Sequence, residues 1–407
     1  MPRKKLPKLA HVCEKNSPLK FENFGIDPEK HGEFKEEILK TARATVKEFP
    51  DLLETIRNNL ADCYPPQALS AFCCYGSAGF ISTTGKQTDA LPEIMQHHCE
   101  LLQAILLTVP QDDWGGKPIT PDAMEVLFNT MPKLSNTFFM QRILEGDTKL
   151  GDEEEQIARS LQERVRMHTH TVRNWGHFDQ VVQISRELYS ALDPKFLKSY
   201  GFSATDLIDT LFAVQAEAEE RMSAHIALLR KVLSGRTAIK LVERYYRFVP
   251  SLVGSADEML SGLPADITRE QMAGMIMAHL DLRLIDTRLF TPEGLSDLTG
   301  KPNEVILAIL SALSLEPGSL MDAKPEFLFL DNPIWERPVI SLNNKYLVPL
   351  PQAAFSHIHR IMERLAREVG LETILREYRA SFLESSVENL FRKALPDANF
   401  YPSFQWE

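Results

Sequence analysis

The chain contains 407 residues, of which 44% are hydrophobic, and this is enough for two or three domains with real cores. Its net charge of −11 argues against a protein that coats nucleic acid non-specifically, but it allows a local basic surface. Five cysteines without a CxxC spacing predict reduced thiols in a cytoplasmic protein. We expect no membrane span, because every apolar run is much shorter than the ~20 residues that a span needs.

Helical periodicity dominates the sequence before residue 330, because apolar residues recur there every three or four positions. The helical segments cover residues 33–59, 91–109, 122–144, 152–171, 178–192 and 204–233. Pro50 predicts a break inside the first segment, and Thr120 followed by Pro121 predicts the start of the third. This pattern predicts antiparallel helices joined by short turns.

The composition changes near residue 325. β-branched and aromatic residues flank the polar pair Asn343 and Asn344, which predicts a β-hairpin. Two further helices are predicted over residues 353–369 and 371–393, and a strand over 399–406. We therefore expect a mainly α protein in which a multi-helix region precedes a small α+β region. The predicted divisions are residues 1–150, 151–320 and 321–407.

The last predicted helix carries a carboxylate on the face expected to be buried. Glu384 lies three residues before Val387 and seven before Phe391, which belong to the apolar stripe of that helix. A buried carboxylate needs an ion pair, hydrogen bonds or a metal. The spacing alone leaves two interpretations open, a structural ion pair and a functional carboxylate. The arginines available for an ion pair on this helix are Arg376, Arg379 and Arg392.

The C-terminal part of the chain resembles restriction-endonuclease-like nucleases of the PD-(D/E)xK type. The pattern RASFLE at residues 379–384, followed by Val387, Leu390 and residues 401–406, is similar to the opening of such a domain. Other segments are similar to parts of bacterial proteins that carry this nuclease at the C-terminus. These segments are residues 100–107, 172–176 and 332–351.

The resemblance implies a function, and it also implies that the family's metal ligands are missing from this chain. In that superfamily a helix with a glutamate precedes a strand, and the metal-binding acids follow on the next hairpin. It implies that Glu384 is a catalytic position, that the α+β region begins an incomplete nuclease-like unit, and that the full-length protein uses Mg²⁺. The family's metal ligands would lie beyond Glu407, so we expect this chain to hold no metal and to be inactive alone.

The expected function is therefore the accessory part of a bacterial metal-dependent nuclease, for targeting, regulation or oligomerisation, with phage defence as one setting. The alternative is a helical protein–protein interaction scaffold without catalytic activity. The expected partners are nucleic acid, a second protein or further copies of the chain.

Two features concern nucleic acid directly. A basic series could form a phosphate-binding surface, or it could be an ordinary solvated face. The series comprises Arg230, Lys231, Arg236, Lys240 and Arg244. Residues 290–315, with Gly300 at the turn, fit either a DNA-reading helix-turn-helix or a plain helical hairpin.

Histidines provide the remaining candidates for metal ligands. His168 and His170 would point roughly 200° apart on a helix, so they would not chelate one ion together with His177 unless the backbone there is extended. The expectation is polar or partly buried histidines, and the sequence predicts no metal site.

Overall fold

The computed structural model describes residues 31–77, 94–147, 161–162, 165, 173, 178–264, 266–323 and 331–397. The chain forms two compact units, Met1–Leu53 with Leu134–Arg164, and Glu54–Lys133 with Val165–Glu407. The boundaries predicted near residues 150 and 320 remain predictions. Most of the helix predicted over 152–171 and all of the strand predicted over 399–406 lie outside the described residues.

The first unit contains α2 (His31–Lys47), the start of α3 (Phe49–Leu60) and the last part of α6 (Pro121–Asp147). The break predicted near Pro50 is confirmed, because α2 ends at Lys47 and Pro50 lies in the first turn of α3. Proline is tolerated there because the N–H groups of a first turn have no partner inside the helix. Pro132 lies inside α6, which nevertheless continues to Asp147.

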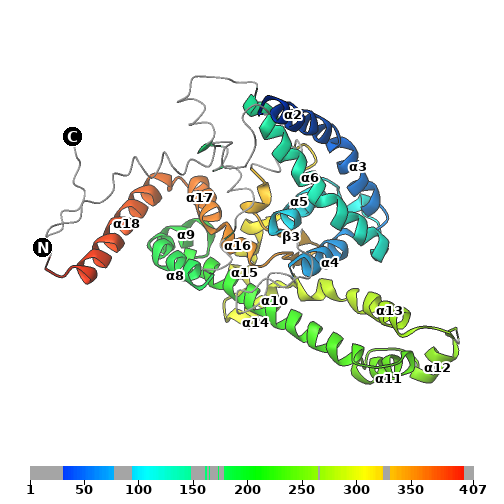
Figure 1. The fold of residues 1–407 in the computed structure, drawn as a ribbon. Helices are drawn as coiled ribbons and strands as arrows, with labels where there is room; N and C mark the ends of the chain where they lie inside the picture. Colours follow the sequence, from blue (N-terminus) through cyan, green and yellow to red (C-terminus); the bar gives the residue numbers. More distant parts are fainter. Residues whose placement is uncertain are drawn as a thin grey trace, which may run out of the picture. The chain divides into compact units, whose positions relative to one another are not determined.

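The second unit contains most of the other helices, which confirms the mainly helical fold (Figure 1). They are α4 (Pro65–Ser77), α5 (Gln96–Leu106), α8 (Phe178–Tyr189), α9 (Asp193–Tyr200), α10 (Ala204–Leu233), α11 (Ala238–Phe248), α12 (Ala256–Ser261), α13 (Arg269–Asp281), α14 (Pro292–Thr299), α15 (Asn303–Leu313), α16 (Ala353–Ser356), α17 (Ile358–Glu368) and α18 (Glu372–Ala394). The short 3₁₀ helices include η6 (Leu284–Thr287) and η8 (Pro333–Trp335).

A small sheet supplies the predicted α+β region. Its strands are β1 (Leu289–Phe290), β2 (Ser314–Leu315), β3 (Val339–Leu342) and β4 (Lys345–Leu347), in the order β1-β4-β3-β2. The predicted hairpin is confirmed: β3 and β4 pair antiparallel, with Leu342 opposite Lys345. β1 adds antiparallel to β4, and β2 adds parallel to β3. The sequence did not predict the two outer strands, because each has only two residues.

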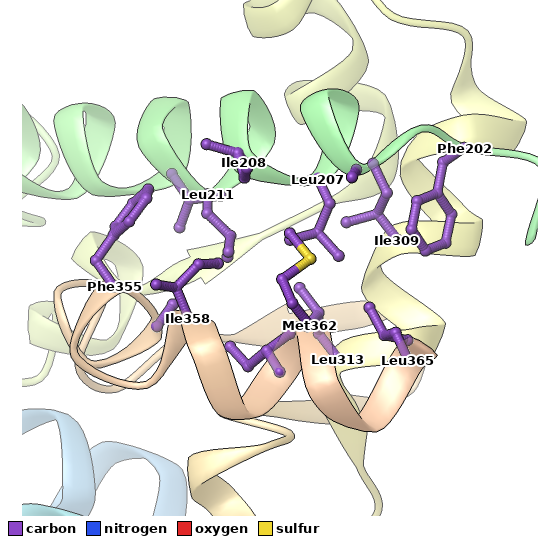
Figure 2. Close-up of a cluster of buried hydrophobic side chains, with 14 of the residues drawn as sticks. Phe202, Leu207, Ile208, Leu211, Ile309, Leu313, Phe355, Ile358, Met362 and Leu365 are labelled. Atoms are coloured by element: carbon purple, nitrogen blue, oxygen red, sulfur yellow. The ribbon is translucent and has the colours of Figure 1, made fainter. Parts of the chain in front are cut away.

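The main core of the second unit lies where α10, α15, α16 and α17 meet (Figure 2). The side chains labelled there come from distant parts of the chain, and each is at most 4% exposed. They are Phe202, Leu207, Ile208, Leu211, Ile309, Leu313, Phe355, Ile358, Met362 and Leu365. Burial of each such side chain stabilises the fold by about 1.5–3 kcal/mol, so this cluster fixes the N-terminal half of α10 in place.

The turn of the hairpin provides a direct test of the fold. Asn343 and Asn344 have φ values of 47° and 64°, a left-handed conformation that glycine adopts readily and β-branched residues avoid. We expect Asn344→Gly to raise the melting temperature and Asn344→Val to cost roughly 1–2 kcal/mol. Lys345→Val is the matched control, because the described non-glycine residues with positive φ are Asn343 and Asn344 alone. Equal melting temperatures for the two valine variants would contradict the turn geometry.

Candidate functional site

The predicted basic series lies around the turn between α10 and α11. In Figure 1, α11 and α12 lie at the far end of the long helix α10, and α13 returns alongside it. A small separate core holds these helices together. Its buried members are Val232, Leu241, Val242, Tyr245, Val249, Met272, Ile276 and Leu280. The turn is therefore part of a packed helical corner.

The local structure of the turn depends on Gly235. A Cβ atom added there would lie 2.8 Å from the backbone nitrogen of Leu241, so only glycine fits this close approach of two backbones. Thr237 caps α11, because its side chain accepts a hydrogen bond from the backbone N–H of Lys240. Arg269 donates to the backbone oxygens of Leu233 and Gly235, each at 3.0 Å, and so satisfies carbonyls at the end of α10.

The five predicted basic residues have different surroundings. Arg230, Lys231 and Arg236 are exposed, and the ion pairs between described residues do not include them. Lys240 is also exposed, but its Nζ lies 2.6 Å from Glu243 Oε2. Arg244 is half-buried, and its Nε donates to the backbone oxygen of Lys231 at 2.7 Å. Arg244 therefore fastens α11 to α10. We call Arg230, Lys231, Arg236 and Lys240 the basic tip.

The charge at this turn is opposite in sign to that of the whole chain. Residues 230–248 contain six Lys and Arg residues and one acid, Glu243, so their formal net charge is 6 − 1 = +5, against −11 for the chain. This stretch, the end of α10 and all of α11, therefore carries a positive formal charge within an acidic chain, and Glu243 compensates part of it by pairing with Lys240.

Glu384 does not lie where its helix pattern predicted. Only the first half of α18 reaches the main core. Leu375 is buried in that core, and the partly buried side chains of Tyr378 and Phe382 pack against it. Glu384 is exposed, and the apolar stripe beside it is exposed as well, with Leu383 64% accessible. The expected buried face is therefore wrong, because periodicity shows which residues share a face but not what covers that face. A catalytic role for Glu384 stays a prediction.

The arginines expected near Glu384 bind other acids. Arg379 pairs with Glu363 of α17 and donates to the hydroxyl of Tyr189 at 3.2 Å. Arg392 binds Glu388, one turn before it on α18, at 2.5 Å. The contacts of Arg379 fasten the start of α18 to α17 and α8. The pair of Arg392 with Glu388 lies within the exposed second half of α18.

Residues 290–315 form two helices joined by a tight turn, as predicted. Thr291 caps α14, and Gly300 has a φ of 68° at the turn into α15. The second helix is largely buried, because Ile306, Ile309, Leu310 and Leu313 pack into the main core. A recognition helix needs an exposed face for base edges, so this burial favours the plain helical hairpin.

A buried carboxylate that the sequence analysis did not single out organises the second unit. Glu100 on α5 is 1% exposed, and four side chains bind it. Arg173 donates through Nε to Oε1 at 3.0 Å and through Nη2 to Oε2. Trp335 Nε1 donates to Oε2 at 2.8 Å, and Gln96 Nε2 donates to Oε1 at 2.6 Å. His357 Nε2 lies 3.3 Å from Oε1. We call these five residues the Glu100 cluster.

The Glu100 cluster holds an ionised carboxylate in the interior. Burial by itself would raise the pKa of Glu100, but His357 and Arg173 outweigh burial and hold that pKa well below its usual value. Burial lowers the pKa of His357, although the charge of Glu100 opposes the shift. The rings of Trp335 and His357 stack, with centroids 5.2 Å apart. With every member so enclosed, the cluster joins segments of the chain and is not an open active site.

The residues of the Glu100 cluster lie in segments that were noted in the sequence, but their spacing along the chain does not reveal that they meet. Three segments noted in the sequence, residues 100–107, 172–176 and 332–351, each supply one member: Glu100, Arg173 and Trp335. Their meeting gives a physical reason for a Glu, an Arg and a Trp in those segments. The distances between the segments along the chain hid the contact.

Other polar groups also join elements. Tyr75 donates its hydroxyl to Asp281 Oδ2 and so connects α4 to α13, whereas His225 Nε2 of α10 lies 4.0 Å from Asp281 Oδ1, beyond hydrogen-bond distance. Burial raises the pKa of Asp281, while the hydrogen bond from Tyr75 opposes that shift. Burial lowers the pKa of His225. Of the histidines considered as metal ligands, His168, His170 and His177 lie outside the described residues.

A pocket of about 450 Å³ lies between α10 and the start of α14. Its cation, Arg221, is bound within the protein: it lies 2.7 Å from Glu217 Oε1 and 2.9 Å from the backbone oxygen of Leu289. The same guanidinium lies over the ring of Phe290, 4.7 Å from its centroid. The guanidinium of Arg221 is thus occupied by contacts within the fold.

Comparisons with known proteins found no significant match to this chain. No protein-family description matches the chain, no curated protein is significantly similar to it, and no solved structure matches its fold. Within the described part of the chain, no helix is long and apolar enough to span a membrane. The described residues also contain no group of three or more His, Cys, Asp or Glu side chains placed to hold a metal ion.

The Glu100 cluster predicts a strong coupling between charges. Glu100→Gln leaves the Arg173 guanidinium buried without its counter-charge, and we expect a loss of about 3–5 kcal/mol of stability. Arg173→Met should cost a similar amount, and the double variant should cost much less than the sum. Urea unfolding of the four proteins measures this difference. Additive losses would show that the two residues do not depend on each other.

The low pKa of Glu100 also predicts a pH dependence. Its folded pKa lies well below the ordinary 4.5, so the unfolded chain takes up a proton first as the pH falls. The contribution of the cluster is complete above the unfolded pKa and is lost below it, toward the folded pKa. On acidification, the melting temperature of the wild type should therefore fall more steeply than that of the double variant.

Proposed function

We propose that the chain is a nucleic-acid-binding accessory module of a metal-dependent nuclease, and that the basic tip contacts the phosphate backbone. The observation that carries this proposal is the exposure of Arg230, Lys231 and Arg236 around the turn between α10 and α11. Lysine and arginine at such a surface bind phosphate without reading sequence. The role as part of a nuclease rests on the resemblance of residues 379–384 to nuclease domains.

The packing of the turn supports this role. Arg244 and Arg269 satisfy carbonyls of α10, so the tip has a fixed shape before any ligand arrives. A preformed cationic surface loses less conformational entropy on binding than a disordered basic arm. The surface presents three or four cations, so we expect modest affinity that depends strongly on salt, as suits an accessory contact.

A second candidate function is protein–protein interaction, and a different observation favours it. The second half of α18 exposes Leu383, Val387 and Leu390 on one side, at 64%, 40% and 66% accessibility. Large apolar side chains gathered on one exposed helix face mark a surface that another protein covers. The two roles use different elements, so one chain can perform both.

The basic tip can be tested by charge removal. The triple variant Arg230→Ala, Lys231→Ala, Arg236→Ala should bind labelled duplex DNA or RNA at least tenfold more weakly at low salt. The slope of log K against log salt should become less steep by about 3, since each lost phosphate contact contributes about −0.9.

The matched control removes three exposed cations elsewhere, with Lys195→Ala, Lys198→Ala and Arg376→Ala. It changes the net charge equally and should bind like the wild type. Equal losses in both triple variants would mean that net charge and not the tip governs binding. Absence of wild-type binding at low salt would refute the nucleic-acid role.

The chain should not cleave nucleic acid by itself. We expect no products above background when it is incubated with single-stranded or linear duplex DNA, or with RNA, in the presence of Mg²⁺ or Mn²⁺. The resemblance matches a single acidic position, Glu384, and cleavage of this kind needs several metal-binding groups. Glu384→Gln is the control: metal-dependent products that disappear with this change would overturn the expectation and identify Glu384 as catalytic.

A further inference from the structure

The exposed half of α18 carries a regular seam in the pattern of a coiled coil. Ala380, Leu383, Val387, Leu390 and Ala394 follow one another at intervals of three, four, three and four residues, and all five are exposed. This is the a/d spacing through which two helices pack side by side. The first half of α18 does not continue the seam outward, because Leu375 is buried in the main core.

We infer that α18 pairs antiparallel with α18 of a second copy of the chain. This inference rests on the interaction role proposed above and names the partner. In the register that pairs the last four seam positions, Leu383 of one copy packs against Ala394 of the other, and Val387 packs against Leu390, while Ala380 lies beyond the paired part. Leucine thus meets alanine in the two end layers and valine in the two middle layers, so each layer contains one leucine and one smaller side chain.

Charge selects this register among the antiparallel ones. Within the paired part, the positions that flank the seam carry Glu384 and Phe391 on one side, and Ser386 and Lys393 on the other. In the chosen register Glu384 faces Phe391 of the second copy and Ser386 faces Lys393, so like charges do not meet. A shift by one heptad would place Glu384 opposite Glu384 of the second copy, and like charges at such positions repel.

The attachment of α18 to its own core selects the antiparallel direction. Residues at the start of the helix are fixed, since Leu375 is buried in the main core and Arg379 binds Glu363. A parallel pair would bring the two main cores to the same end of the seam. An antiparallel pair keeps them at opposite ends, and it also places each helix dipole against one of opposite direction.

The size of the seam limits its strength. It covers about two heptads, fewer than the three or four over which a stable coiled coil usually extends. Two chains joined by this seam alone should therefore associate weakly, with a Kd between about 1 µM and about 1 mM. We expect a mixture of one and two chains at moderate concentration, the monomer being 46.2 kDa.

Sedimentation of the full chain over that concentration range tests the association. The average mass of the wild type should rise with concentration toward two chains. The variant Leu383→Glu, Leu390→Glu should remain a monomer at every concentration. The matched control Ser385→Glu, Asn389→Glu adds the same charge to exposed positions of α18 outside the seam and should behave like the wild type. A monomeric wild type, or an equal loss in the control, would overturn the inference.

Cysteine cross-linking tests the direction. In a Cys13→Ser background, mixed Leu383→Cys and Ala394→Cys proteins should form a disulfide-linked pair under mild oxidation, and neither should link efficiently alone. Efficient self-linking of Leu383→Cys would overturn the antiparallel arrangement. Both experiments are independent of nucleic acid, so their failure can be distinguished from a failure of the basic tip.

Discussion

The buried charge of Glu100 is the constraint on which the second unit depends. A carboxylate without water must be compensated by donors, and here the donors come from α5 itself, from residue 173, from η8 and from the end of α16. Its contact with His357 spans 257 residues of sequence. Because the loss of one partner leaves the others uncompensated in the interior, these segments must assemble together, and the cluster joins the residues just before β3 and just before α17 to α5.

Helix α10 links this assembled part to the basic tip. Its first half lies in the main core through Leu207, Ile208 and Leu211, and its end contributes Val232 to the small core beneath the tip. One continuous helix of 30 residues therefore belongs to two cores. Continuous backbone hydrogen bonding makes such a helix stiff, so the position of the tip is set by the main core. The charges there are presented by a packed corner and not by a loose loop.

Helix α18 also has two halves with different surroundings. Its first half is fixed by Leu375 and by the pair of Arg379 with Glu363, and its second half leaves an apolar face exposed. This explains why the buried position predicted for Glu384 was wrong. The sequence pattern of a helix that packs on its own core is the same as that of a helix that packs on another protein. In both, apolar residues recur with the helical period of 3.6 residues per turn, so this period carries no information about the partner.

Local rules determined much of the fold. Helical periodicity located α8 and α10, proline placed the break before α3, and the Asn343–Asn344 pair specified the hairpin, because these features depend on contacts between residues close in sequence. The sequence also contained the basic series and the residues of the Glu100 cluster, but not their arrangement. Only the tertiary structure decided that Arg244 is a structural residue, that the stripe beside Glu384 is exposed, and that Glu100, Arg173 and Trp335 meet. Burial and long-range pairing result from the packing of distant segments, and no local pattern encodes that packing.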